Sequence, residues 1–141
     1  MTKSELLVKL RKEVTAEEYK FIKDAKMPHL SAFNRSLILR MMSEDAVGEE
    51  SVDDVEVKHL EEITNRYLMQ YLAGHPKAWK WICISCVYTA FILKVPMHPQ
   101  EAVHYVRKAG QGKTEYYCPA KSMQPDTNCS FCVCRHADEA R

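Results

Sequence analysis

The residues WICISCVYTAFIL, from Trp81 to Leu93, are the stretch that most constrains the fold. They read as a helix that is apolar around most of its circumference, and such a helix is stable only where other elements cover it on all sides. The run is shorter than the roughly 20 residues that cross a bilayer, and Lys80 and Lys94 flank it, so a membrane span is not predicted. We therefore expect a buried helix over about 76–94, at the centre of a helical bundle.

Two short helices, or one bent helix, are predicted at the beginning of the chain, over residues 3–26. Thr2 and Glu5 have the spacing of a capping box, in which the two side chains satisfy each other's backbone N–H groups at the start of a helix. Thr15 and Glu18 repeat that spacing.

A third and a fourth helix are predicted before the central one. The third follows Pro28 and covers about 31–43, where apolar side chains recur at helical spacing. Ser51 is expected to cap the fourth helix, which runs to about Ala73. The side chains that this fourth helix is predicted to bury are Val55, Leu60, Ile63, Tyr67 and Tyr71.

Overall charge does not direct this chain to nucleic acid or to an anionic membrane, because the formal net charge is only +1. The excess of basic residues lies in the second half of the chain, where Arg107, Lys108, Lys113 and Lys121 form a modest basic rim. Without an organised aromatic surface this rim is a weak indication of nucleic-acid binding. The N-terminal sequence lacks the apolar core of a secretory signal, so a cytoplasmic protein without membrane association is expected.

Four of the six cysteines lie in the cysteine segment, residues 116–136, which reads YYCPAKSMQPDTNCSFCVCRH. Cys129 and Cys132 form a C-x2-C pair that brings two thiolates to one metal ion, and Cys118 supplies a third. Candidates for a fourth ligand are Cys134, His136 and His98. The segment has few large apolar side chains, so a structural zinc ion would supply the stability that burial does not.

Three other interpretations of these cysteines remain open. The first is an iron–sulfur cluster, because thiolates suit iron as well as zinc. The second is a thiol redox site at Cys132 and Cys134, and the third is a tail without metal. Cys83 and Cys86 lie within the apolar helix, and core packing is the favoured interpretation of this pair. No phosphate-binding loop, nucleophile elbow or metalloprotease motif is present in the sequence, so a non-catalytic role is favoured over an enzyme.

The C-terminal residues from about 98 to 132 resemble a known family. A His-Pro pair follows the apolar helix at His98, a Tyr-Tyr-Cys-Pro-x-Lys element spans 116–121, and Cys-x-Phe-Cys spans 129–132. This pattern is similar to that of an uncharacterised, mainly methanogen and archaeal protein family, a domain of unknown function of the UPF0305/DUF2115 kind. In this chain the sequence QEAVHYVRKAGQGKTE replaces the family's glycine-rich stretch between the first two elements. The resemblance implies a cytoplasmic archaeal protein and a ligand set of His98, Cys118, Cys129 and Cys132, with Cys134 as the substitute.

The predicted fold is mainly α: about five helices in a bundle over residues 1–95, and a small β-hairpin with a cysteine-rich metal-binding loop over 96–141, packed together as one compact unit. A short helix over 100–108 is the alternative to the first strand of the hairpin. The predicted function is that of a small accessory or interaction module with a structural zinc ion, whose partner is another protein. A thiol- or iron–sulfur-based redox sensor or enzyme is the alternative, and nucleic-acid binding is a weaker one.

Overall fold

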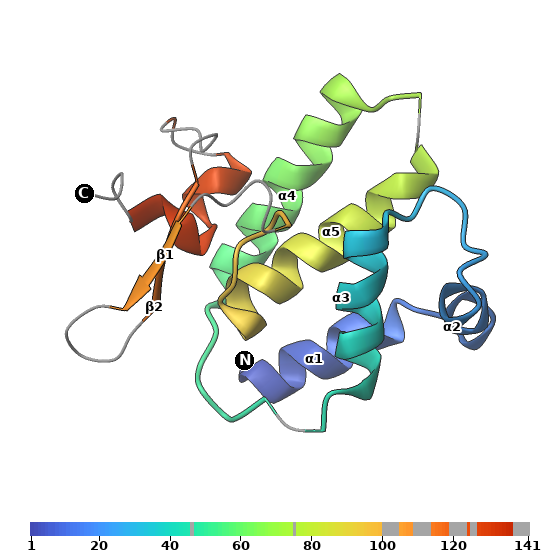
Figure 1. The fold of residues 1–141 in the computed structure, drawn as a ribbon, viewed down its shortest axis with the longest axis horizontal. Helices are drawn as coiled ribbons and strands as arrows, with labels where there is room; N and C mark the ends of the chain where they lie inside the picture. The colour runs from blue at the N-terminus through green and yellow to red at the C-terminus, as the bar shows by residue number, and fades with distance from the viewer. Residues whose placement is uncertain are drawn as a thin grey trace.

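The structure is a computed structural model that describes residues 1–45, 47–74, 76–99, 105–108, 114–118, 124 and 127–136. This part of the chain is mainly helical with five α-helices, which confirms the predicted class (Figure 1). The helices are α1 (Lys3–Lys12), α2 (Ala16–Lys23), α3 (Ala32–Ser43), α4 (Asp54–Tyr71) and α5 (Trp79–Val87). Shorter helical turns are η1 (Pro76–Ala78), η2 (Tyr88–Leu93), η3 (Asn128–Ser130) and η4 (Val133–His136). Across the described residues, every helix is too short or too polar to cross a membrane.

Capping boxes start α1 and α2, as the sequence predicts. The Thr2 hydroxyl accepts a hydrogen bond from the Glu5 backbone N–H at 3.1 Å, and the Glu5 carboxylate accepts one from the Thr2 N–H at 3.0 Å. Thr15 and Glu18 make the same reciprocal pair at 3.1 and 2.9 Å. Each box satisfies N–H groups that have no partner within the helix, which fixes where each helix begins.

The apolar run lies at the centre of the bundle, as predicted. α5 packs against α3 and α4, and η2 follows α5 directly and packs against α1 (Figure 1). The first turn of the expected single helix is the 3-10 turn η1, and the last six residues, η2, have the wider winding of a π-helix. Thr89 lies where the winding changes, and its hydroxyl donates to the Ser85 carbonyl at 2.8 Å. A hydroxyl that binds the carbonyl one turn earlier competes with the helical ladder and bends the helix.

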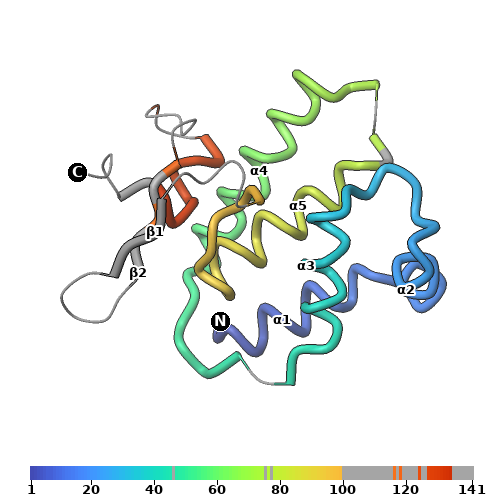
Figure 2. The backbone as a smooth tube through the Cα atoms, viewed as in Figure 1, coloured from blue at the N-terminus to red at the C-terminus, as the bar shows by residue number. Residues whose placement is uncertain are grey.

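The start of α4 differs from the prediction. Ser51 forms a β-bridge with Thr2, so it pairs with the N-terminal segment instead of capping α4. Asp53 caps the helix, and its carboxylate accepts a hydrogen bond from the Val55 N–H at 2.9 Å. Figure 2 shows the connection from α3 to α4 passing beside the N-terminus, where the Met1 ammonium group lies 2.8 Å from Asp54.

The buried face of α4 also differs from the prediction. Leu60 and Ile63 are buried as expected, but Val55, Tyr67 and Tyr71 are 74%, 53% and 63% exposed. The buried positions of α4 are Val57, Leu60, Ile63, Thr64 and Leu68. α4 and α5 diverge toward the C-terminal end of α4 (Figure 1), and on its last two turns Leu68 is buried whereas Tyr67 and Tyr71 are exposed. The two tyrosines therefore stand outside the core, although their spacing is that of an apolar stripe.

Two strands follow the bundle. β1 (Tyr105–Lys108) and β2 (Thr114–Tyr117) pair antiparallel, with Tyr105 opposite Tyr117 and Lys108 opposite Thr114. β2 packs against η4, and η3 packs against α4. These C-terminal elements lie on the side of α4 that faces away from α3 (Figure 1). The turn AGQGK between the strands and the residues from Gln100 to His104 lie outside the described residues.

Candidate functional site

Two consecutive tight turns shape the cysteine segment from Thr127 onward. The backbone N–H groups of Ser130, Phe131 and Cys132 donate in turn to the carbonyls of Thr127, Asn128 and Cys129, at 2.9, 3.1 and 3.3 Å. Side chains three positions apart, such as those of Cys129 and Cys132, lie on the same side of a chain wound with such i to i−3 bonds. Cys129 is half-buried, whereas Cys132 is buried.

Three of the predicted ligands are buried in the hydrophobic core cluster that the helices form. Cys118, directly after β2, is 7% exposed, and Cys132 and Cys134 are 8% and 1% exposed. Phe131 anchors the same turn, since its ring lies 5.4 Å from the His59 ring, edge to face. His59 of α4 thus contributes to the contact between α4 and the cysteine segment.

Asn128 joins the cysteine segment to the two central helices. Its side-chain amide donates to the Thr64 hydroxyl of α4 at 2.8 Å and lies 3.6 Å from the Cys86 sulfur of α5. The Thr64 hydroxyl in turn donates to the Leu60 carbonyl at 2.8 Å, so a chain of hydrogen bonds runs from the segment into α4. The role of Asn128 was not predicted, because a single asparagine beside a C-x2-C pair carries no signal of which distant helix it contacts.

A cavity of about 810 Å³ opens between α4, α5 and the cysteine segment. Its walls come from the start of α3, the second half of α4, the middle of α5, the connector Met97–Pro99 and the turn Thr127–Cys129. The aromatic lining residues are Phe33, Tyr67 and Tyr71, and the aliphatic ones include Ile63, Leu68, Leu72, Ile82 and Met97. Polar residues such as Asn34, Gln70 and Asn128 also line it, and its volume is typical of small-molecule sites.

The cavity brings together two of the predicted metal ligands, His98 and Cys129, and adds Cys86. Cys118, Cys132 and Cys134 are not part of its lining. Within the described residues, which include all five predicted ligands, no three His, Cys, Asp or Glu side chains are grouped as metal ligands. The side chain of His136 lies outside the described part. Metal binding at these residues therefore stays a prediction.

Cys83 and Cys86 are half-buried on α5. Burial raises the pKa of the Cys83 thiol to about 12, and the nearby Glu61 carboxylate acts in the same direction. Burial also raises the pKa of Cys86, to about 11, although the Asn128 amide opposes the shift. Both cysteines are therefore protonated at neutral pH, and the thiol form is a poor nucleophile.

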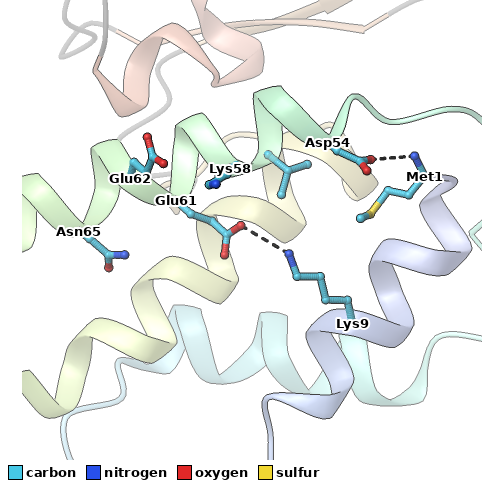
Figure 3. Close-up of a pocket in the computed structure, with 8 residues that line it drawn as sticks. Met1, Lys9, Asp54, Lys58, Glu61, Glu62 and Asn65 are labelled. Carbon is cyan, nitrogen blue, oxygen red and sulfur yellow. Dashed lines mark hydrogen bonds and ion pairs between the residues drawn. The ribbon is translucent and has the colours of Figure 1, made fainter.

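A second cavity, of about 460 Å³, lies between α1 and α4 (Figure 3). The Lys9 ammonium group is 3.7 Å from the Glu61 carboxylate there, and the Met1 ammonium group contacts Asp54. Because these charges of both signs are already paired across the cavity, it is the weaker candidate for a ligand site.

The fold and the site together describe a mainly helical protein whose cysteine-rich C-terminal segment closes a ligand-sized cavity. Residues 2–137 match the family described as "Uncharacterized protein conserved in archaea (DUF2115)", and the chain belongs to that family.

UPF0305 protein MJ0646 of Methanocaldococcus jannaschii is a relative that is 30% identical over 110 residues. The matched region covers 73% of this chain and 65% of the relative, so the chain spans about two thirds of the relative's length. No solved structure matches this chain.

Proposed function

We propose that this protein is a non-catalytic accessory module of the cytoplasm, and that a structural zinc ion holds its cysteine segment against the helices. Cys118, Cys129 and Cys132 are the proposed thiolate ligands, His98 is the fourth, and Cys134 is the substitute. The proposed architecture divides the chain into a bundle over 1–95 and a hairpin-and-loop module over 96–141. The partner in this proposal is another protein.

The chemistry of the donors supports zinc. Three cysteine sulfurs and one imidazole are a common ligand set for structural zinc. The donors also lie on elements that contact one another, because Cys118 follows β2, β2 packs against η4, and Cys132 directly precedes η4. A bound zinc ion would draw these donors together and hold the thiols as thiolates.

The contact of Asn128 with both α4 and α5 carries the proposal. This side chain precedes the C-x2-C pair and bonds to Thr64 and Cys86, so the position of the metal-binding turn is coupled to the helices. Holding the turn in place would therefore also fix one wall of the large cavity. An ion in that position organises a surface without taking part in a reaction.

The redox alternative receives less support. It requires accessible thiolates at Cys132 and Cys134, and both side chains are buried. Buried structural cysteines are generally inert. For nucleic-acid binding, two of the four residues of the basic rim, Lys113 and Lys121, lie outside the described residues.

The test is metal analysis of protein purified without oxygen, with a count of reactive thiols before and after chelation. We expect about one zinc ion per chain, and thiols of the cysteine segment that react only after a chelator is added. Cys132→Ser should lose the zinc ion, while the matched variant Cys83→Ser should retain it. Iron in place of zinc would favour the iron–sulfur alternative. Metal-free protein with promptly reacting thiols would refute the zinc proposal.

A further inference from the structure

We propose that the cavity between α4, α5 and the turn Thr127–Cys129 binds an organic anion, in which an aromatic ring system carries one carboxylate or phosphate group. This binding goes beyond the proposed function and rests on it in one respect, since zinc would hold one wall of the cavity. The other walls belong to α3, α4, α5 and the connector that follows η2.

The size of the cavity fits a small molecule. Its volume of about 810 Å³ lies within the range of about 300–1,000 Å³ that is usual for sites that bind organic ligands. Its lining comes from α3, α4, α5, the connector Met97–Pro99 and the turn Thr127–Cys129, so several elements together set its shape.

The aromatic side chains of α4 point to a ring-containing ligand. Tyr67 and Tyr71, one turn apart, have ring centroids 4.8 Å apart and are both more than half exposed. Both line the cavity, together with Phe33 from the start of α3. Exposed aromatic surface is unfavourable in water, and a flat ligand that stacks on these rings would cover it.

The positive charge of Arg66 in the lining favours a ligand with a negative charge. Arg66 lines the cavity between aliphatic and aromatic neighbours, and the described lining contains no Asp or Glu. The cavity between α1 and α4 differs, because Asp54, Glu61 and Glu62 line it. A guanidinium group binds carboxylate and phosphate with two parallel hydrogen bonds, so Arg66 is suited to hold the head group of such a ligand.

A buried hydroxyl on α5 gives an independent indication of a polar ligand atom. Ser85 lines the cavity and is 5% exposed, and its Oγ has no hydrogen-bond partner among the described residues. By contrast, the buried hydroxyls of Thr64 and Thr89 each donate to a helix carbonyl. A buried polar atom without a partner is costly, and an oxygen of a bound ligand would satisfy it.

The experiment measures binding of three related probes by titration calorimetry and by amide chemical-shift mapping of the full chain. Naphthoate and naphthyl phosphate carry the proposed anionic groups, and naphthamide is their neutral counterpart. We expect both anions to bind with one-to-one stoichiometry and with shifts that centre on Arg66, Tyr67 and Ser85. Naphthamide should bind at least about tenfold more weakly, because it loses the charge-assisted hydrogen bonds.

Two matched variants test the role of the arginine. Arg66→Gln removes an exposed charge from α4 and should reduce naphthoate binding to the level of naphthamide. Lys58→Gln removes the same charge from an exposed position of the same helix that lines the other cavity, and it should leave binding unchanged. Equal affinities for naphthoate and naphthamide, or unchanged naphthoate affinity in Arg66→Gln, would overturn the proposal.

Other occupants of the cavity give different results. If a second copy of the chain covers it, sedimentation will show a dimer that Tyr67→Glu dissociates, and naphthoate will not bind; that result overturns the proposal. Zinc content, measured on the same samples, separates this inference from the proposed function. Naphthoate binding without zinc would refute only the zinc site, and zinc without naphthoate binding would refute only the ligand site.

Discussion

The helical body (residues 3–93) and the cysteine segment both bury side chains in one core, but they do so with different chemistry. The body contributes aliphatic and aromatic groups such as Leu6, Leu60 and Tyr88, which are fully buried. The segment contributes mainly cysteines, whose small side chains remove little apolar surface from water. Its position depends on a few directed contacts, above all those of Asn128. The body should therefore resist the loss of a single polar contact, whereas the segment should not.

The largest effect is expected from a cavity in the body. Leu60→Ala removes a side chain of α4 that is 0% exposed and should lower the free energy of unfolding by about 2–5 kcal/mol. Urea denaturation followed by circular dichroism measures it. Val55→Ala on the same helix is the control, and it should change stability by less than about 0.5 kcal/mol because Val55 is exposed. Similar effects of the two variants would show that α4 does not pack as described.

The next largest effect is a loss of stability at alkaline pH, and it is expected from Cys86, where the helical body meets the cysteine segment. Burial raises the pKa of Cys86 in the folded protein to about 11 from its ordinary value of 9.0, so the folded state holds this proton more tightly. The resulting stability, on the order of 2 kcal/mol, is present below pH 9 and is lost as pH rises through about 11. Between pH 8 and 11, the free energy of unfolding should therefore fall less for Cys86→Ala than for the wild type, as measured by denaturation at each pH. A difference between wild type and variant that does not change with pH would contradict the assignment.

A smaller effect is expected where the segment meets the helices. Asn128→Ala removes the hydrogen bond to Thr64 and should cost about 1–2 kcal/mol. Amide hydrogen exchange should show lost protection at 129–132, with the protection of α1 and α3 unchanged. Asn65→Ala, at an exposed position of α4, is the matched control and should leave the segment protected. Uniform loss across the chain would mean that segment and body unfold as one cooperative unit.

The smallest effect should stay within the body. Thr15→Ala breaks the capping box of α2 and should cost about 0.5–1 kcal/mol, because α2 then begins with unsatisfied N–H groups. Thermal unfolding measures this loss of stability, and Thr15→Ser should retain most of the stability of the wild type. Faster hydrogen exchange confined to residues 16–19 would agree with a local role, whereas exchange that also increases in the cysteine segment would argue against the separation of the two regions.

Local signals in the sequence predicted the helical body well. The capping boxes at Thr2 and Thr15 act between residues three positions apart, and the structure contains both. The all-apolar run from Trp81 requires cover on every side, and it lies at the centre. The prediction for α4 was wrong at Ser51, Val55, Tyr67 and Tyr71, because helical periodicity indicates which side chains share a face but not how far a neighbouring helix covers it.

The sequence by itself determined the helices, their caps, the central position of the apolar run and the family resemblance at the C-terminal motif, because each depends on residues close together in the chain. Tertiary structure decided which residues of α4 are buried, that α4 and α5 diverge to leave a cavity, and that Asn128 reaches Thr64 across 64 positions of sequence. It also placed Arg66, Tyr67 and Ser85 around one space. These features depend on the angle at which two helices cross, and that angle follows from the packing of all their side chains together.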